Sequence, residues 1–204
     1  MNIDLTVNIY SSTIIETVQR KFGPHSTLAF AYFYFDFNDP EKQKYNNLLR
    51  SLITQLSWRF QSVPSALREL YSQKQNGTQN PTSGDLLTLF KKLCEPFMHT
   101  YIILDALDEC TGTERSHVLG FVETLVGWGF DNLHLLVTSQ KQPEIERRLE
   151  SLNCNQLDLG TTLIHQDIQI YIQTMLAEDE SFRHWRANEK KLIEDTLMNG
   201  ANGM

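Results

Sequence analysis

Residues 102–109 read Ile-Ile-Leu-Asp-Ala-Leu-Asp-Glu, an apolar run that ends in an aspartate and continues with two more carboxylates. Such a run predicts a buried strand, so Asp105 is expected at the strand's carboxyl end. A carboxylate there can hold a magnesium ion through one or two bonds, provided that nucleotide phosphates supply the remaining ligands. The stretch therefore indicates part of a nucleotide switch, with Asp105 as the magnesium ligand.

Strand and helix patterns alternate on both sides of this stretch. Strands are expected at 28–35, 101–105, 133–138 and 156–159. Helices are expected at 14–22, 45–60, 64–74, 114–126, 142–149, 165–176 and 189–198, with one more that Asp85 caps. This alternation predicts an α/β fold with a mainly parallel sheet. Because only helical patterns follow residue 160, we expect a core at 1–160 and the beginning of a helical subdomain at 161–204.

Charge and composition exclude several classes of partner. The net charge is -7, and no basic cluster is longer than a pair, which argues against nucleic acid. The longest apolar run, 28–35, is far shorter than the roughly 20 residues of a membrane span. The first ten residues lack a basic segment, so no signal peptide is predicted. Three widely spaced cysteines without a C-x-x-C favour reduced thiols and a cytoplasmic protein.

Five segments together resemble a known family. They are Ser-Thr-Ile-Ile-Glu (12–16), Ala-Tyr-Phe-Tyr-Phe-Asp (31–36), Ile-Ile-Leu-Asp-Ala-Leu-Asp-Glu-Cys (102–110), Leu-Leu-Val-Thr-Ser (135–139) and Asp-Ile-Gln-Ile-Tyr-Ile (167–172). In order and spacing they are similar to fungal NACHT domains, also described as nephrocystin-like N-terminal NTPase domains. These domains occur in large NOD-like receptors of the STAND class that carry repeat domains.

The resemblance implies a P-loop NTPase fold and a nucleotide switch that uses Mg with ATP or GTP. It assigns the metal to Asp105 and the polarisation of the attacking water to Asp108 or Glu109. It places Thr138 and Ser139 on a strand that senses the γ-phosphate. Such switches oligomerise, so homo- or hetero-oligomers with other NACHT proteins are the expected partners.

Two departures weaken what the resemblance implies. The family's phosphate-binding loop, G-x-x-x-x-G-K-[ST], would place its lysine at Val7 and its hydroxyl residue at Asn8, and no glycine precedes Gly23. Without glycines and lysine the backbone cannot cradle phosphates, so we expect that this chain binds neither nucleotide nor Mg tightly. The family's sensor strand ends Thr-Ser-Arg, whereas here Gln140 replaces the cation.

The absent loop also implies an absent strand. The predicted fold is therefore a parallel-sheet, three-layer P-loop NTPase-like core that lacks its first (Walker A) strand. That strand would lie between 133–138 and 156–159 and would bury about five apolar side chains, each contributing roughly 1.5–3 kcal/mol. Residues 3–9 alternate apolar and polar side chains, and a central strand would bury Asp4 and Asn8. We expect this segment to be an edge strand, a helix extension or disordered.

Simpler interpretations stand beside these. Asp105, Asp108 and Glu109 could be a polar turn whose acids favour the amino end of the next helix. Thr138 and Ser139 could be a polar strand end. Cys110 is interpreted as a small buried hydrophobic residue, because the neighbouring acids disfavour a thiolate.

Three functions follow from these observations. The first is a fragment or degenerate form of a NACHT-type switch that does not bind or hydrolyse ATP or GTP by itself. The second is an incomplete gene product of an active NACHT ATPase or GTPase. The third is a non-enzymatic module that associates with intact NACHT proteins. The ending at Gly203-Met204 indicates a truncated helical region.

Overall fold

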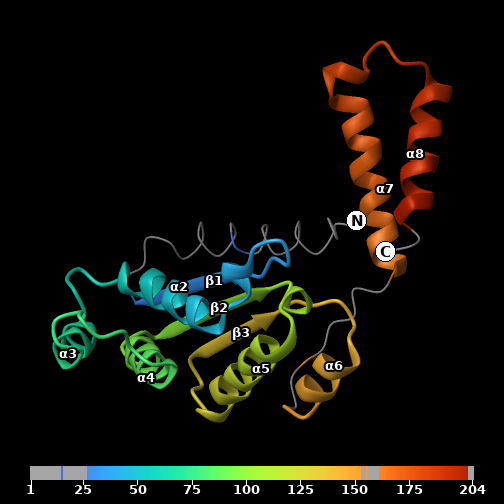
Figure 1. The fold of residues 1–204 in the computed structure, drawn as a ribbon. Helices are drawn as coiled ribbons and strands as arrows, with labels where there is room; N and C mark the ends of the chain where they lie inside the picture. Colours follow the sequence, from blue (N-terminus) through green and yellow to red (C-terminus); the bar gives the residue numbers. More distant parts are fainter. Residues whose placement is uncertain (1–14, 16–26, 153–154, 156–160, 202–204) are drawn as a thin grey trace. The chain divides into compact units, whose positions relative to one another are not determined.

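The computed structural model describes residues 15, 27–152, 155 and 161–201 (Figure 1). The chain divides into two compact units, Val7–Cys154 and Asn155–Met204 with Met1–Thr6. Each unit is described by itself.

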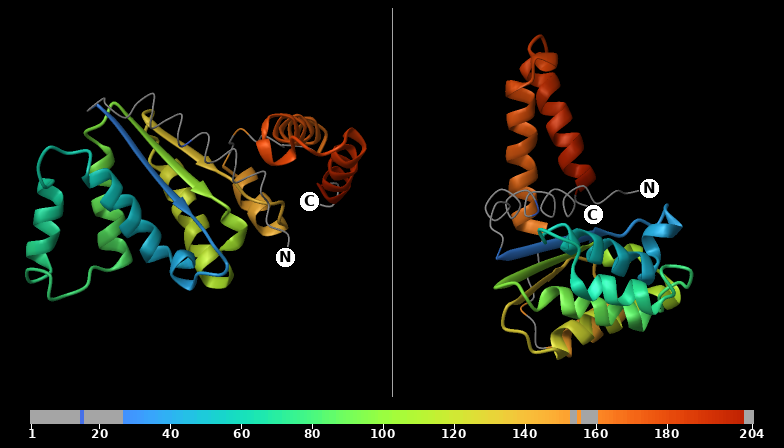
Figure 2. Two further views of the ribbon diagram at one scale, coloured as in Figure 1. Left: turned by 90° about the horizontal axis from the view of Figure 1, so that it is seen from above. Right: turned by 90° about the vertical axis from the view of Figure 1, so that its left-hand side faces the viewer.

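The first unit contains three parallel strands in the order β1-β2-β3 within the described residues. They are β1 (Leu28–Tyr34), β2 (His99–Asp105) and β3 (Leu133–Val137), and they lie side by side in Figures 1 and 2. Tyr34 is the register partner of Asp105, and Leu104 is the partner of Val137. The strands therefore end together, as the expected α/β fold with a parallel sheet requires.

One face of the sheet carries the core of this unit. The helices α2 (Tyr45–Ser57), α4 (Ser83–Cys94) and α5 (Gly112–Gly127) bury leucine-rich faces in the same hydrophobic cluster as β1 and β2. On β1, Ala29, Ala31 and Phe33 are buried, and the alternate residues are half-buried. One face of β1 is therefore fully buried and the other is partly buried. Three aromatic rings pack in a row along its second face, with the rings of Phe30 and Tyr32 tilted and those of Tyr32 and Tyr34 edge to face.

A side chain of α2 pairs with the outer edge of β1 at one residue. The amide of Gln55 on α2 accepts from the backbone N–H of Tyr32 at 3.0 Å and donates to its carbonyl at 2.7 Å. An unpaired strand edge is a template for pairing with another chain, and this contact removes one residue from that template.

The remaining elements of the first unit are short. They are η1 (Pro40–Gln43), α3 (Ser65–Gln73), η2 (Leu107–Glu109) and α6 (Pro143–Glu150). The expected cap of α4 was placed on the wrong residue, because Thr82 is the N-cap and Asp85 is the third residue of the helix. The two side chains form a capping box, in which each accepts a backbone N–H of the other.

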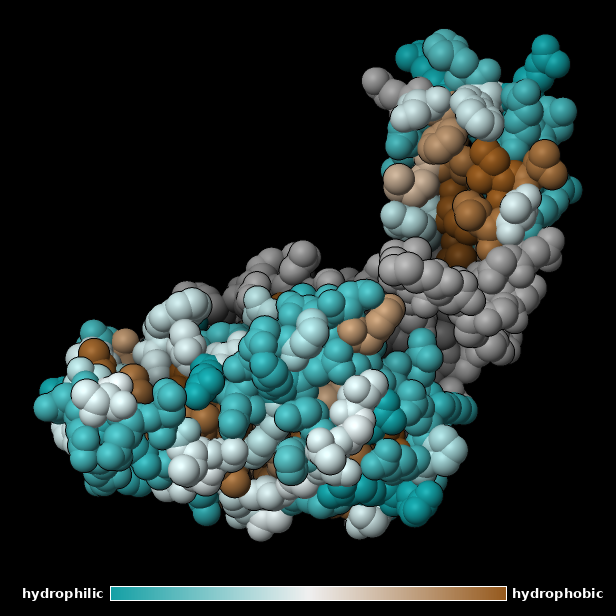
Figure 3. Space-filling model, viewed as in Figure 1, coloured by the Kyte–Doolittle hydropathy of each residue, from teal (hydrophilic) through white to brown (hydrophobic). Residues whose placement is uncertain are grey.

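The second unit is a helical hairpin of α7 (Thr161–Glu178), η3 (Glu180–Phe182) and α8 (Ala187–Ala201). Ile172 and Leu176 are buried, and Glu194 of α8 accepts from Gln169 at 2.9 Å and Gln173 at 2.7 Å on α7. Figure 3 shows apolar side chains gathered where the two helices meet. None of the helices in the described part of the chain has the length and apolar character needed to cross a bilayer.

Three expectations lie outside the described residues. They concern the segment 3–9, the strand at 156–159 with the missing strand beside it, and the helix at 14–22 except for Ile15. That residue is helical and buried.

Candidate functional site

The carboxyl ends of the three strands bring polar side chains to one edge of the sheet. We define the carboxyl edge by the segments 35–37, 105–109 and 138–140, which follow β1, β2 and β3. The strand register fixes this meeting, because parallel strands that end level deliver their next residues to the same place.

Asp105 is the last residue of β2 and is only 1% exposed. Its Oδ1 accepts from the Thr138 hydroxyl at 2.5 Å. A buried carboxylate is costly unless it is hydrogen-bonded, so this short bond stabilises the position of Asp105. The hydroxyl oxygen of Thr138 in turn accepts from the backbone N–H of Ala106 at 3.0 Å.

The backbone around the end of β2 is hydrogen-bonded to the segments that follow β1 and β3. The N–H of Phe35 donates to the carbonyl of Asp105 at 3.0 Å, and the N–H of Leu107 donates to the carbonyl of Thr138 at 2.9 Å. Ala106 adopts the left-handed conformation, with φ 57° and ψ 49°. That conformation is uncommon for a residue with a side chain, and it turns the chain sharply from the strand into η2.

Asp108 and Glu109, the expected water-polarising residues, both hold backbone amides. Oδ1 of Asp108 accepts from the N–H of Gln140 at 2.9 Å, which joins η2 to the segment after β3. Oε2 of Glu109 accepts from the N–H of Phe37 at 3.0 Å, which joins η2 to the turn after β1. The two carboxylates thus connect the three segments of the carboxyl edge.

The electrostatics of the carboxyl edge are unfavourable for a further negative charge. Partial burial raises the pKa of Glu109, and the charges of Asp108, Asp36 and Asp105 raise it further, against the lowering effect of the Phe37 N–H. The pKa of Asp36 is lowered, chiefly because its carboxylate accepts from the N–H of Asn38.

Arg115, near the beginning of α5, holds the acidic loop at 105–110 in place through hydrogen bonds to its backbone. Its Nη2 donates to the carbonyl of Asp108 at 2.7 Å, and its Nε donates to the carbonyl of Cys110. Its Nη1 donates to Gln142 and lies 3.8 Å from Glu144. One guanidinium therefore connects η2, α5 and the beginning of α6.

The structure brings together four of the five expected site residues. Asp105 and Thr138 are hydrogen-bonded, and Asp108 and Glu109 lie in the loop beside them. Ser139 is not part of this arrangement, because its hydroxyl donates to the carbonyl of Gln140 at 2.8 Å. Cys110 is buried, and burial is the main reason why its pKa is raised to about 11. Its thiol is therefore protonated at neutral pH and packs as a small hydrophobic side chain.

Two contributors were missed from the sequence. Arg115 was missed because its acceptors at η2 are backbone carbonyls, which leave no trace in side-chain pattern. Its place just behind an acidic loop was the available signal. Asp36 was noted only as part of a motif, although it follows β1 as Asp105 ends β2.

The described residues do not form a magnesium cage. Among the parts of the chain that the structure describes, no group of three or more His, Cys, Asp or Glu side chains converges to hold a metal. Asp108 and Glu109 are already engaged with backbone amides. Magnesium at Asp105 would therefore need ligands other than these side chains, such as the phosphate oxygens of a nucleotide.

Comparison with known proteins gives one family. The model described as "Nephrocystin 3, N-terminal" matches residues 8–140, which is more than half of the chain. The match contains β1, β2 and β3 and all three segments of the carboxyl edge. No curated protein and no solved structure matches the sequence.

Proposed function

Because the chain belongs to the nephrocystin 3 N-terminal family, we propose that it is a NACHT-related signalling module. In this proposal the module has the carboxyl edge of a nucleotide switch, but it neither binds nor hydrolyses ATP or GTP by itself. Membership of a NOD-like receptor of the fungal STAND type is part of the same proposal.

The bond between Asp105 and Thr138 carries this proposal. It joins the acidic end of β2 to the end of β3, where a switch needs its metal ligand and its phosphate sensor to respond together. A second link, from the Gln140 N–H to Asp108, runs between the same two segments. A displacement of β3 at its end would therefore move the acidic loop.

The lack of nucleotide affinity follows from charge. The carboxyl edge presents Asp36, Asp105, Asp108 and Glu109, and Gln140 stands where the family has an arginine. A triphosphate adds several negative charges to this cluster. Lys42 pairs with Asp36 at 3.4 Å and Arg115 donates to the Asp108 carbonyl, so part of this charge is offset. Neither cation replaces the lysine and the cradle of glycine N–H groups with which the family's loop holds phosphates.

Isothermal titration of the full chain with Mg-ATP, and separately with Mg-GTP, tests the proposal. We expect no saturable heat, and the same result for Asp105→Asn. Saturable binding of either nucleotide would overturn the proposal, and its loss in Asp105→Asn would show that the carboxyl edge is a working nucleotide site.

Association with other NACHT proteins is a second candidate function. It is favoured by three large apolar side chains of the helical hairpin, Ile170, Tyr171 and Leu192, which are 61%, 59% and 67% exposed. Large apolar side chains with this exposure are candidates for contact with another protein chain. Light scattering coupled to size exclusion, with and without Ile170→Glu and Leu192→Glu, tests it. We expect a concentration-dependent mass that the substitutions reduce, and a monomer at all concentrations would contradict it.

A further inference from the structure

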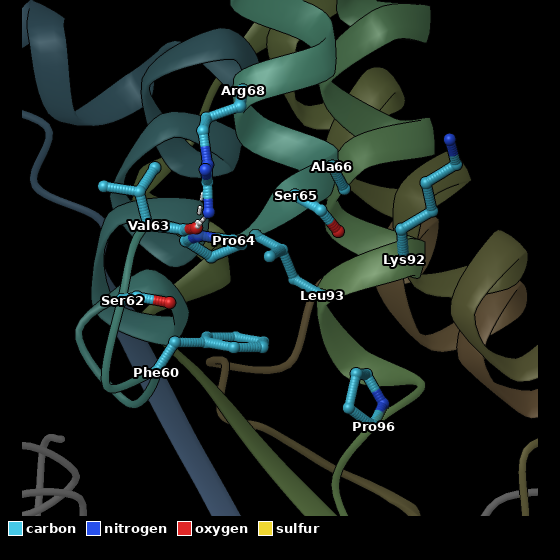
Figure 4. A pocket seen from close by; sticks show the side chains of 10 residues that line it. All are labelled: Phe60, Ser62, Val63, Pro64, Ser65, Ala66, Arg68, Lys92, Leu93 and Pro96. Carbon is cyan, nitrogen blue, oxygen red and sulfur yellow. Dashed lines mark hydrogen bonds between the residues drawn. The ribbon is translucent and has the colours of Figure 1, made fainter.

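The amino ends of the strands carry a second surface, with the opposite character from the carboxyl edge. A hollow of about 310 Å³ lies between the end of α2, α3 and α4. Its apolar lining consists of Phe60, Val63, Pro64, Ala66, Leu93 and Pro96. Arg68 and Lys92 also line it and lie on opposite sides of it in Figure 4. This volume is at the small end of ligand sites and suits one large apolar side chain.

The hollow is built on a backbone that is held in place. The rings of Phe60 and Phe97 pack edge to face with centroids 5.2 Å apart, which joins the loop after α2 to the loop after α4. Asn132 donates to the Phe97 carbonyl at 2.7 Å, and Met98 N–H donates to the Thr27 carbonyl at 2.8 Å. A preformed hollow lowers the entropy cost of binding, because little has to be ordered.

Large apolar side chains stand exposed around this end of the sheet. Trp58, Met98 and Val63 are 79%, 65% and 55% exposed. Met98 precedes β2, and Trp58 precedes Arg59, whose Nη2 contacts the Leu28 carbonyl at the beginning of β1. Tryptophan, methionine and arginine are the residues that protein interfaces concentrate.

The charge of this surface differs from that of the whole chain. Residues 57–69 and 91–98 hold four basic side chains and two acidic ones, a net charge of +2, whereas the chain carries -7. Of the four basic side chains, Arg68 and Lys92 line the hollow, whereas Lys91 lies over the rings of Trp128 and Phe130. Lys92 pairs with Glu69 at 3.2 Å, but both side chains are about half exposed. Such a pair is worth little in water, so an incoming carboxylate can replace Glu69.

We propose that the hollow between α2, α3 and α4 binds an acidic peptide segment of a partner protein, with one large apolar side chain inserted. The apolar side chain contacts Phe60, Leu93 and Pro96, and carboxylates on either side of it pair with Arg68 and Lys92. A peptide fits better than an anionic membrane, because the charge is small and the surface is concave. The strands separate this surface from the carboxyl edge by about 20 Å, so a peptide bound here does not contact the carboxyl edge.

Selection of random twelve-residue peptides on the immobilised full chain tests the proposal. We expect enriched peptides with one Phe, Leu or Trp between Asp or Glu residues. Their affinity is then measured by fluorescence anisotropy on four forms of the chain. These are the unchanged chain, Arg68→Glu/Lys92→Glu, Ser65→Trp, and Arg147→Glu/Lys191→Glu.

Arg68→Glu/Lys92→Glu should weaken binding by about tenfold or more, because each attraction between a cation of the hollow and a peptide carboxylate becomes a repulsion. Ser65→Trp should weaken it by a similar factor, because Ser65 is an exposed residue that lines the hollow and a larger side chain fills it. Arg147→Glu/Lys191→Glu matches the first variant in net charge at exposed positions elsewhere and should change affinity less than about twofold.

Circular dichroism melts show that each variant is folded before its affinity is compared. Peptides without acidic residues, or acidic peptides that bind both charge-reversed variants equally, would overturn the proposal. Binding to phosphatidylserine vesicles in the absence of any selected peptide would overturn it as well.

Discussion

Glu109 fixes the position of a neighbouring backbone amide but lowers the stability of the fold at neutral pH. Its carboxylate anchors Phe37 N–H, yet burial and three neighbouring acids raise its pKa above the ordinary value of 4.5. A raised pKa in the folded state means a stabilising contribution at pH below 4.5 that is lost as the pH rises through the folded pKa. Ionised Glu109 therefore weakens the fold at neutral pH.

We expect Glu109→Gln to raise the melting temperature at pH 7 by about 1–3 °C. Glutamine still accepts the Phe37 N–H but carries no charge, so the repulsion disappears while the bond remains. Differential scanning calorimetry from pH 4 to pH 8 measures the effect, which should vanish toward pH 4. Glu109→Ala, which loses the acceptor, is the control and should not stabilise the chain. A lower melting temperature for Glu109→Gln at pH 7 would contradict this account.

Thr138 is a neutral residue of the carboxyl edge whose hydroxyl stabilises the end of β2. Thr138→Val keeps the shape but removes the hydroxyl that serves Asp105 and Ala106. We expect a loss of about 1–3 kcal/mol in the free energy of unfolding, because a buried carboxylate loses its donor. Urea unfolding measures it, with Ser139→Ala as a control that should cost less than about 0.5 kcal/mol. Equal stability of Thr138→Val and the unchanged chain would show that the bond contributes nothing.

His134 on β3 gives a test at acidic pH. Its Nε2 lies 3.0 Å from Nδ1 of His99 on β2, and the Tyr101 ring stacks on it at 4.6 Å. Partial desolvation of the ring beside its neighbours, and secondarily the charge of His99, lowers the pKa of His134 below its ordinary value of 6.5, although the residue lies at the surface. A lowered pKa means stability that is present above pH 6.5 and lost as the pH falls toward the folded pKa.

We therefore expect His134→Gln to reduce the loss of melting temperature between pH 7 and pH 5 by about 1–3 °C. Thermal melts at half-unit intervals of pH are the measurement. The exposed His184 supplies the matched control, and His184→Gln should leave the profile unchanged. If His134→Gln lost as much melting temperature between pH 7 and pH 5 as the unchanged chain, His134 would not be the source of this pH dependence.

At the scale of elements, the acidic loop η2 depends on a helix that follows it. Arg115 of α5 donates to the carbonyl of Asp108 in this loop, to that of Cys110 just after it, and to Gln142 before α6. The planar guanidinium can reach all three acceptors at once, whereas the single ammonium of lysine cannot.

We expect Arg115→Lys to destabilise the chain by about 1–3 kcal/mol and to increase hydrogen exchange at residues 106–110 and 139–142. Arg148→Lys is the comparison, because Arg148 joins α5 and α6 through Glu123 without contacting η2. Faster exchange confined to α6 in both variants would mean that Arg115 does not hold the loop.

The elements themselves followed closely from the sequence, for reasons that particular residues make clear. The helical spacing of Leu48, Leu49, Leu52 and Leu56 located α2, and the polar stop at Asp105 located the end of β2. The contacts of Arg115 did not follow, because carbonyl acceptors have no sequence signature.

At the scale of the whole molecule, the first unit places opposite chemistry at the two ends of one parallel sheet. Acidic side chains gather at the carboxyl edge, whereas cations and exposed apolar side chains surround the amino ends. This polarity could not be read from the net charge of -7, because it arises only when loops distant in sequence meet. It places the proposed switch and the proposed docking surface at opposite ends of the same sheet.

A crystal structure of the full chain soaked with magnesium and a non-hydrolysable ATP analogue tests the central claim most directly. We expect the parallel strands to end level, the Thr138 hydroxyl to bond Asp105, and no triphosphate at the carboxyl edge. A triphosphate seated beside Asp105, with magnesium on that carboxylate, would contradict the account.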